Sequence, residues 1–453
     1  MHITNKNTIL DTDSYKLSHY AQYDPSVQST SAYISTRGVS DNFPKTDKHV
    51  FFGLQAWIKE NLDGRFIRSS MIDEAKLFAE MHGEPFNTEG WNGISSRGGY
   101  VPVEIQALEE GSIVPIKTPV VQVVSTDPEN AWVANSLETS LQRGVWYPSM
   151  VSTLSYLMKQ KIGRYWQLTV DEENWPGLEF ALHDFGGRGA TSFESAGIGG
   201  MAHLVNFKGS DTITGILFAK NYYGGSMAGF SVPAAEHSTA TSWGRAREVD
   251  FVSNMIDRFG GPGKIYSVIG DTYDIYNFVD NIVTDFLLKK IINKGGRFVI
   301  RPDSGDPEVV LSKILGIFEK KNMFSLNKKG YKVLPDYFRI LWGDGINYYS
   351  AGDILDAMIK LGWSAENFVF GMGGALLQKL DRDGLKWSMK LNAVDRGYGW
   401  EAVSKDPITD PGKASMGGYV QGIPVVWRNG YWNRKYDDFN DIRARVAQSA
   451  LMH

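Results

Sequence analysis

The stretch REVDFVSNMIDRFGGPGKIYSVIGD (247–271) contains the two patterns that decide the fold. Its first part, 247–260, has apolar residues at the spacing of an amphipathic helix. A Gly-Gly-Pro-Gly break follows, and the apolar run IYSVI then leads into Gly270 and Asp271. A short apolar run framed by turn residues predicts a buried strand, here with a carboxylate at its carboxyl end.

Strand-like runs of the same form recur on both sides of this stretch. They are LEFALHDF (178–185), GFSVPAAEH (229–237), GRFVIRPD (296–303), FRILWGD (338–344), NFVFGMGG (367–374) and LKWSMKLNAV (385–394). Helical patterns such as AGDILDAMIKLG (351–362) separate several of them. Alternating helices and mostly apolar strands predict a parallel sheet covered by helices.

The first 170 residues follow a different pattern. Strand-like runs at 30–36, 100–108 and 118–126 are mixed with helical patterns at 50–62 and 129–145, and NGISSRGGY (92–100) is predicted to be a loop. A chain of 453 residues also exceeds the usual size of one hydrophobic core. We therefore predict a β-rich α+β domain from residues 1–170 together with 395–453, and an α/β-barrel catalytic domain at 171–394.

The composition excludes several classes of protein. The chain has no cysteine, which excludes a disulfide scaffold, a thiolate nucleophile and cysteine-ligated metal sites. A net charge of −4 argues against a general nucleic-acid-binding surface, so phosphate binding requires a local cluster. There is no signal-peptide core at the N-terminus and no apolar run long enough to span a bilayer. We expect a cytoplasmic enzyme that binds neither nucleic acid nor membrane.

Polar residues gather where the predicted strands end. These are His183-Asp184, Glu236-His237, Asp271, Arg301 to Asp303, Asp344 and Gly371 to Gly374. In a closed α/β barrel, the carboxyl ends of the strands form one face, and that face carries the active site. The pattern therefore predicts an active site on a barrel face.

The residue types on this face suggest phosphate chemistry. His237, among small and hydroxyl residues, is a candidate general base, metal ligand or phosphoryl acceptor. Carboxylates with few histidines and no cysteine suit a hard ion such as Mg²⁺, bound partly through substrate phosphates. The glycines at 371–374, between a strand and a helical pattern, are typical of a phosphate cradle. A phosphorylated sugar is the simplest substrate class.

Several motifs resemble those of one enzyme family. They are DTDSYKLSHY (11–20), HDFGGRGATSFESAGIGGMAHLVNFKGSDT (183–212), GFSVPAAEHSTATSWG (229–244), DTYDIYN (271–277), RPDSGDP (301–307), GDGI (343–346) and GGALLQKLDRD (373–383). In order and spacing, they resemble the nicotinamide phosphoribosyltransferase family, which consists of type II phosphoribosyltransferases. The resemblance implies an irregular α/β barrel with parallel strands, a β-rich domain built from both chain ends, and a homodimer with active sites at the subunit interface.

The family reaction transfers phosphoribosyl from 5-phosphoribosyl-1-pyrophosphate to nicotinamide, which gives nicotinamide mononucleotide and pyrophosphate. The resemblance implies that Phe185 stacks on the nicotinamide ring, with Tyr15 of the partner subunit on the other face. It also implies that Asp211 accepts a hydrogen bond from the carboxamide NH₂ of nicotinamide. Arg301 and Asp303 are expected to hold the base and the ribose, with Asp344 nearby.

Phosphate groups are assigned in the same way. The 5′-phosphate is expected to be bound by Arg188, Gly373 and Gly374, beside Gly343 and Asp344. Pyrophosphate and ATP-phosphate contacts, several of them across the dimer, are implied for Arg37, Arg382, Ser388, Lys390 and Lys405. The cofactors implied are Mg²⁺, held mainly by substrate phosphates with unknown protein ligands, and ATP.

His237 matches the family's transiently phosphorylated histidine, and Asp274 is expected to orient it through a hydrogen bond. Two departures from the family pattern, Gly187 and Gly270, stand where relatives carry larger residues, so we expect a wider tunnel for the nicotinamide base.

Two other functions are alternatives to the nicotinamide enzyme. A nicotinate or quinolinate phosphoribosyltransferase would need a cation in place of Asp211, and a non-catalytic binding protein would show erosion of the acid and phosphate motifs, which are intact.

Overall fold

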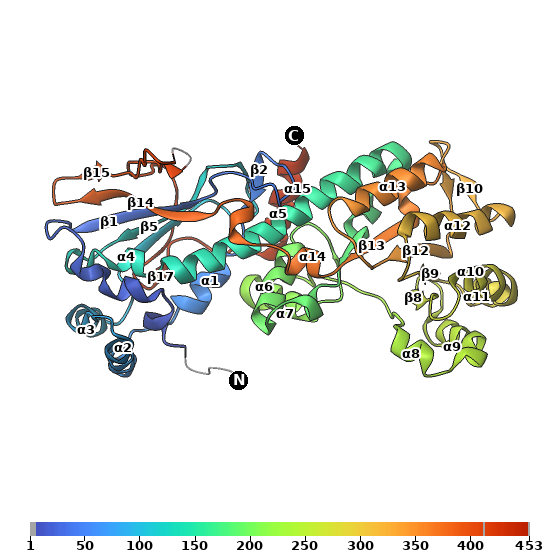
Figure 1. The fold of residues 1–453 in the computed structure, drawn as a ribbon, viewed down its shortest axis with the longest axis horizontal. Helices are drawn as coiled ribbons and strands as arrows, with labels where there is room; N and C mark the ends of the chain where they lie inside the picture. The colour runs from blue at the N-terminus through green and yellow to red at the C-terminus, as the bar shows by residue number, and fades with distance from the viewer. Residues whose placement is uncertain (1–5, 411–412, 452–453) are drawn as a thin grey trace. The chain divides into compact units, whose positions relative to one another are not determined.

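The computed structural model describes residues 6–410 and 413–451. The chain forms two compact units, which are described one at a time (Figure 1). Unit 1 comprises Met1–Thr153, Ala219–Ser226 and Asp381–His453, and unit 2 comprises Leu154–Phe218 and Met227–Leu380. The predicted domains differ from these units at residues 154–170, 219–226 and 381–394.

Unit 2 is built on a six-stranded parallel sheet in the order β7-β6-β13-β12-β9-β8. The strands are β6 (Leu182–Asp184), β7 (Gly209–Ser210), β8 (Ile265–Ile269), β9 (Arg297–Arg301), β12 (Phe338–Trp342) and β13 (Phe368–Met372). Phe298 and Ile300 on β9 and Phe338 and Ile340 on the adjacent β12 are fully buried. These apolar strands are buried, as parallel strands covered by helices are.

The segment Phe230–Ala235 links the two edge strands of this sheet. Ser210 N–H donates to the carbonyl of Phe230, and Ala235 N–H donates to the carbonyl of Ser267 on β8. The segment forms only isolated bridges, because Pro233 has no N–H to give to a ladder. The sheet therefore curls into an irregular α/β barrel, and the predicted fold class is confirmed.

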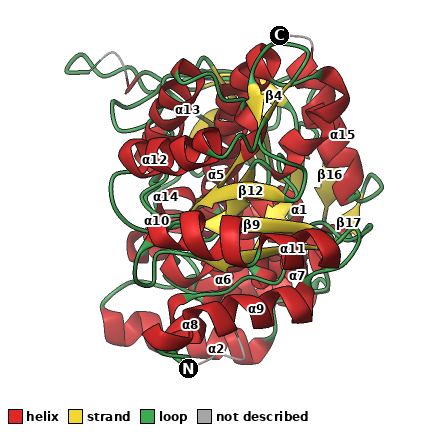
Figure 2. Cartoon of the chain, turned by 90° about the vertical axis from the view of Figure 1, so that its right-hand side faces the viewer, coloured by secondary structure: helices red, strands yellow, loops and turns green. Residues whose placement is uncertain are grey.

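Helices cover the barrel strands (Figure 2). α9 (Glu248–Phe259) buries Phe251, Val252, Met255 and Ile256 on one face, as the spacing of the opening stretch predicts. α12 (Pro307–Lys320) begins at the cap Asp306, whose carboxylate accepts from Val309 N–H, with proline at the first helical position. Besides short 3-10 helices, unit 2 contains α6 (Phe193–His203), α8 (His237–Thr241), α10 (Ile275–Asn277), a π-helix (Phe278–Phe286), α11 (Leu288–Lys294), α13 (Ser350–Lys360), α14 (Gly374–Leu377), β10 (Ser325–Leu326) and β11 (Lys332–Val333).

Unit 1 is built on a seven-stranded antiparallel sheet in the order β15-β14-β1-β5-β3-β16-β17. The strands are β1 (Ser29–Ser35), β3 (Val103–Ala107), β5 (Pro119–Ser125), β14 (Ser388–Asp395), β15 (Trp400–Ala402), β16 (Val425–Arg428) and β17 (Tyr431–Trp432). A separate pair joins β2 (Lys48–Val50) to β4 (Ile113–Pro115). The sheet therefore combines strands from both chain ends.

The helices of unit 1 are α1 (Leu54–Asn61), α2 (Ser69–His82), α3 (Thr88–Ser96), α4 (Val133–Ser136) and α15 (Phe439–Leu451); α5 (Glu138–Thr169) and α7 (Ile213–Tyr223) contribute to both units. The prediction of a loop at 92–100 was wrong for residues 92–96, which belong to α3. Asn87 caps this helix, and Trp91 and Ile94, three residues apart, bury its inner face. The local glycines and serines concealed that apolar pair.

The strand predicted at 385–394 also needs a correction. It was grouped with the barrel strands, but β14 pairs antiparallel with β1, in the register Tyr33 to Lys390 and Ser35 to Ser388. Periodicity predicts that a segment is extended and carries no information on its partner strand, which decides the sheet to which it belongs.

Candidate active site

Most of the polar residues predicted at strand ends follow the parallel strands of unit 2, but Glu236 and His237 follow a segment that forms only isolated bridges. His237 begins α8, just after the segment that links the edge strands, and Asp271 lies two residues beyond β8. The His237 Nε2 atom lies 3.0 Å from Oδ1 of Asp271. The imidazole is 48% exposed and the Asp271 side chain only 5%, so a buried carboxylate orients an accessible histidine.

Asp274 does not make the predicted hydrogen bond to His237. Its Oδ1 accepts from the backbone N–H groups of Tyr276 and Asn277, at 3.0 and 3.1 Å, and so caps α10. Asp274 stands at the start of a short helix, where Asp is a preferred capping residue, and Asp271 stands two residues beyond β8. The partner of His237 is therefore Asp271.

Phe185 lies over glycines at the ends of two strands. A Cβ added to Gly371 would lie 2.0 Å from the Phe185 ring, and one added to Gly343 would lie 3.1 Å from it. The ring is half-buried, and the guanidinium carbon of Arg301 lies 5.7 Å from its centroid. The aromatic ring thus has a glycine floor and a cationic neighbour, an arrangement that suits a flat aromatic ligand.

Arg301 and Asp303 form a pair at the end of β9. The Arg301 Nη2 atom donates to both carboxylate oxygens of Asp303, at 3.1 and 3.2 Å. Both side chains are 20% exposed, and the buried Nε of Arg301 has no hydrogen-bond partner among the described residues. A Cβ on Gly343 would lie 3.4 Å from Asp303 Oδ1, so Asp303 and Phe185 converge on the same glycine. Asp344, next along the chain, is exposed.

Asp211 follows β7 and is exposed. The Ser231 hydroxyl donates to its Oδ1, and the backbone N–H of Asp211 donates to the carbonyl of Asp184 at 2.9 Å. Burial lowers the pKa of His183, and the charge of Asp211 opposes this lowering. A hydrogen-bond-accepting carboxylate therefore stands at this strand end.

Asp184 supports the loop that begins with Phe185. Its Oδ1 accepts from Gly186 N–H at 2.7 Å, and its side chain is fully buried. Burial is the main reason that the pKa of Asp184 is raised to about 6, and the charge of Asp211 adds to the rise. Asp184 thus acts on the loop backbone rather than on a ligand.

The predicted 5′-phosphate residues come from two adjacent segments. Gly189 packs on Gly374, since a Cβ on Gly189 would lie 3.4 Å from the Gly374 Cα. Nothing lies within 4 Å of the position that a Gly374 Cβ would take. Arg188, next to Gly189, is exposed. The structure therefore places the backbone beside Arg188 against Gly374, where the space next to Gly374 is open.

The expected widening of the base tunnel does not occur at Gly270. A Cβ there would lie 2.7 Å from the Phe278 ring and 2.8 Å from Ile275, so these side chains fill the space that a larger residue would need. At Gly187 a Cβ would meet the Thr212 side chain at 3.1 Å. The structure therefore has no empty space beside Gly270.

Unit 1 holds the predicted pyrophosphate residues as a cation cluster, defined as Arg37, Arg382, Lys390 and Lys405. Lys390 donates to the carbonyl of Met389 at 3.0 Å, and Arg37 donates to the carbonyl of Lys386 at 3.3 Å. Burial lowers the pKa of Lys390, and the charges of Arg37, Lys405 and Arg382 lower it further. These cations therefore lie near one another, in an arrangement that favours a polyvalent anion.

Two further residues of unit 1 adjoin this cluster. Glu138 opposes the lowering of the Lys390 pKa, and it forms an ion pair with buried Lys16 at 2.6 Å. The Ser388 hydroxyl is buried and has no hydrogen-bond partner among the described residues. Tyr15, beside Lys16, is 55% exposed, with its ring 5.3 Å from that of His19.

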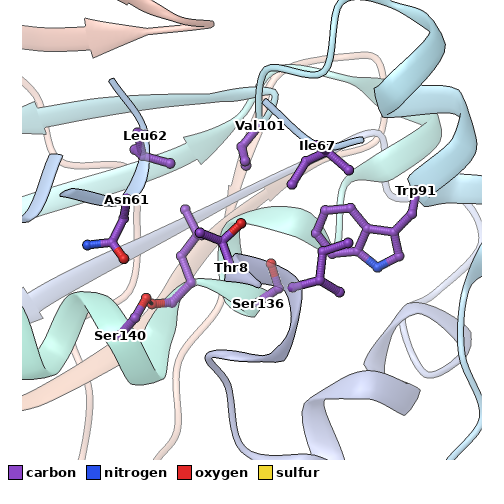
Figure 3. Close-up of a pocket in the computed structure, with 10 residues that line it drawn as sticks. Thr8, Asn61, Leu62, Ile67, Trp91, Val101, Ser136 and Ser140 are labelled. Atoms are coloured by element: carbon purple, nitrogen blue, oxygen red, sulfur yellow. Dashed lines mark hydrogen bonds between the residues drawn. The ribbon is translucent and has the colours of Figure 1, made fainter. Parts of the chain in front are cut away.

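Unit 1 also contains a small cavity. Asn61, Trp91, Ser136 and Ser140 are among the residues that line it (Figure 3). Its volume of about 10 Å³ is room for one water molecule at most. None of its lining residues is a predicted site residue.

Sequence reasoning missed three supporting groups. Asp271 was noted at a strand end but not as the partner of His237, and neither Ser304 nor Ser231 was assigned a role. Ser304 donates to the second oxygen of Asp271. The signal for Asp271 was its place directly after the strand; the serines carried none, since hydroxyl residues are common in turns.

Two family models match the chain. One, the nicotinate phosphoribosyltransferase (NAPRTase) family, matches residues 180–441, and the other, the nicotinamide phosphoribosyltransferase N-terminal domain, matches residues 7–105. A nicotinamide phosphoribosyltransferase from Xanthomonas campestris pv. campestris (strain 8004) is 46% identical over 91% of this chain and 86% of its own length. The chain belongs to the nicotinamide phosphoribosyltransferase family.

More distant relatives agree with this membership. A nicotinamide phosphoribosyltransferase from Mycoplasma pneumoniae is 29% identical over 92% of this chain and 95% of its own length. The fold matches a nicotinate-nucleotide pyrophosphorylase from Pyrococcus furiosus, with a TM-score of 0.61, 15% identity and coverage of 100% and 98% of the two chains. Human nicotinic acid phosphoribosyltransferase has a TM-score of 0.57 and 15% identity, over 97% and 93%. The nicotinamide phosphoribosyltransferase family is thus built on a fold that nicotinate enzymes share.

Proposed function

We propose that the protein transfers the phosphoribosyl group of 5-phosphoribosyl-1-pyrophosphate to the ring nitrogen of nicotinamide, in the salvage route to NAD. The bond from C1 of the ribose to pyrophosphate breaks, and a bond from C1 to the pyridine nitrogen forms. The family membership supports this, and the observation that carries it is the Phe185 ring on its glycine floor, with Arg301, Asp303 and Gly343 beside it.

In this proposal the residues work by position and charge. Nicotinamide stacks on Phe185, and Asp303 lies where positive charge develops on the ribose in an oxocarbenium-like transition state. Arg188, Gly373 and Gly374 bind the 5′-phosphate through a cation and open backbone N–H groups. Asp344, exposed next to Gly343, faces the ribose.

Asp211 favours the amide over the acid as substrate. A carboxamide NH₂ donates a hydrogen bond to a carboxylate, whereas a nicotinate carboxylate would meet Asp211 with like charge and no donor. A site built to pair with a donor discriminates strongly against an analogue that lacks it. The alternative, a nicotinate or quinolinate enzyme on the same fold, requires a cation at this position.

Mg²⁺ is proposed as the ion that neutralises the departing pyrophosphate. Among the described residues no group of three or more His, Asp or Glu side chains is placed to hold a metal ion. Asp303 and Asp344 offer the hard oxygen donors that Mg²⁺ takes one or two at a time, with substrate phosphates completing the set.

His237 is proposed as the acceptor of the γ-phosphoryl group of ATP. A carboxylate can only accept, so the hydrogen bond to Asp271 places the imidazole proton on Nε2 and leaves the lone pair on Nδ1. Nδ1 then forms the bond to phosphorus as ADP leaves, and water later hydrolyses the phosphohistidine. Asp274 keeps a supporting role as the cap of α10.

The cation cluster of unit 1, with Ser388, is proposed to bind pyrophosphate or the phosphates of ATP. The exposed Tyr15 is proposed to cover the second face of nicotinamide in another copy of the chain, within a homodimer. No helix in the described ranges is long and apolar enough to cross a membrane. A cytoplasmic location remains a prediction.

Product formation from three separate substrates tests the reaction. The purified protein receives 5-phosphoribosyl-1-pyrophosphate, Mg²⁺ and ATP, with nicotinamide, nicotinate or quinolinate supplied alone. We expect nicotinamide mononucleotide from the first at a rate at least about a hundred-fold above the others, because a mismatched polar group is strongly rejected. Turnover of nicotinate alone would refute the assignment, and no turnover at all would favour a non-catalytic binding protein.

The phosphohistidine role is tested with His237→Ala. We expect this variant to retain ATP-independent transfer but to lose ATP hydrolysis and the stimulation by ATP, since only the acceptor nitrogen is removed. Rates with and without ATP, for the variant and the wild type, provide the comparison. An ATP response that survives in the variant contradicts the role.

A further inference from the structure

Ser304 lies where two neighbouring strands end. β8 and β9 pair in parallel with Ile269 opposite Arg301, and Gly270 N–H continues the pairing by donating to the Arg301 carbonyl at 3.0 Å. The residues that follow each strand are therefore held side by side. Asp271 comes directly after this pairing on one side, and Asp303 and Ser304 come after it on the other.

Ser304 completes the coordination of Asp271. The Ser304 hydroxyl donates to Oδ2 at 2.5 Å, and His237 Nε2 occupies Oδ1 at 3.0 Å. A hydrogen bond from a hydroxyl to a charged carboxylate is stronger than one between neutral groups. The Asp271 side chain is 5% exposed, so each carboxylate oxygen has a protein donor and little access to water.

Ser304 is also joined to the substrate side of the site. It follows Asp303, whose carboxylate is held by two contacts from Arg301, and Arg301 lies over the Phe185 ring. Asp303 and Ser304 are thus consecutive residues of one loop, with Asp303 held by Arg301 and Ser304 by its bond to Asp271. The chain of contacts runs from the aromatic ring through Arg301, Asp303, Ser304 and Asp271 to His237.

We propose that Ser304 is a positioning residue that couples phosphorylation of His237 to occupancy of the Arg301–Asp303 pair. This inference rests on the proposed phosphohistidine. When Ser304 holds Asp271, the carboxylate keeps the His237 proton on Nε2 and presents Nδ1 to the phosphoryl donor. When the hydroxyl is absent, Asp271 is free to rotate and His237 loses its fixed tautomer and orientation.

The matched pair Ser304→Thr and Ser304→Val isolates the hydroxyl, because the two side chains have the same branched shape and only Thr can donate. Ser312→Ala, which removes a hydroxyl that donates only to the Glu308 carbonyl in α12, is the control. Each variant is assayed for acid-labile phosphohistidine by ³¹P NMR and for ATP hydrolysed per nicotinamide mononucleotide formed. Thermal unfolding verifies the fold.

We expect Ser304→Val to lower the phosphohistidine level and the ATP stimulation about ten-fold, as loss of a hydrogen bond to a charged group does. Ser304→Thr and Ser312→Ala should behave as wild type. Equal phosphohistidine in the Val and Thr variants overturns the proposal, and so does loss of ATP-independent transfer in the Val variant alone. Wild type that makes the mononucleotide but forms no phosphohistidine removes its premise, whereas wild type without product refutes the proposed function itself.

Discussion

Gly371 determines where the aromatic ring of Phe185 can lie. A methyl group at this position would come within 2.0 Å of the ring, a distance that no side-chain adjustment of a few tenths of an ångström can relieve. Gly343 lies beside the same ring, since a Cβ added there would be 3.1 Å from it. The Phe185 ring must therefore move from its position if Gly371 is replaced by a residue with a side chain.

Replacing Gly371 with alanine should consequently lower kcat/KM for nicotinamide about 10- to 100-fold, the range associated with ångström-scale misplacement of a binding group. Initial rates at varied nicotinamide measure it. Gly316→Ala is the matched control, because nothing lies within 4 Å of its added methyl. Normal nicotinamide kinetics in the Gly371 variant would show that the ring position is not needed.

At the same scale, the sequence predicted strand-end residues better than their partners. Arg301 and Asp303 lie where the apolar run ends. They contact each other because side chains two positions apart in an extended chain point to the same side. His237 was predicted with the wrong aspartate. Asp271 and Asp274 are three residues apart in one loop, and only the backbone path decides which carboxylate turns towards the imidazole and which caps α10.

The strand β2 contains a buried histidine that should make the protein sensitive to acid. His49 is fully buried against Trp387, with ring centroids 5.0 Å apart, and neither of its ring nitrogens has a hydrogen-bond partner among the described residues. Burial lowers the pKa of His49 to about 3. Below pH 6.5, His49 binds a proton in the unfolded chain but stays neutral in the folded chain. The free energy of unfolding therefore falls as the pH falls towards 3.

For His49 alone, the free energy of unfolding should drop by about 2 kcal/mol between pH 7 and pH 5. His49→Phe keeps an aromatic ring against Trp387 and removes this drop, so the difference between wild type and variant in urea unfolding at the two pH values is the measurement. His82→Gln, at the surface end of α2, is the matched control. A pH difference that is identical in wild type and the His49 variant would contradict the prediction.

Elements were predictable from the sequence where their own residues carry the pattern. The apolar residues of α9 have helical spacing, and those of the barrel strands form continuous runs, so the sequence predicts both. The pairing between strands was harder to predict. β14 resembles any other strand of the chain, yet it lies beside β1, more than 350 residues earlier, and only long-range contact determines this. The closing segment Phe230–Ala235 was predicted as a strand, but its proline reduces it to isolated bridges.

At the scale of the whole molecule, the exposed Tyr15 can serve either its own chain or the active site of another copy. If Tyr15 merely packs within its own copy, each chain is catalytically complete. If it covers nicotinamide on Phe185 of another copy, each site needs unit 2 of one chain and Tyr15 of the next. The 55% exposure of Tyr15 favours the second interpretation, because an exposed aromatic ring leaves a face free for a ligand.

Mixing two inactive variants distinguishes these cases. Phe185→Ala and Tyr15→Ala are each expected to lose most activity, since each removes one side of the stack. If sites are shared, random exchange of subunits puts half of the dimers in the mixed state, with one intact site each, so activity should recover to about one quarter of wild type. The rate after exchange, measured against each variant alone, gives the answer, and a dimer that shows no recovery would place each complete site within a single chain.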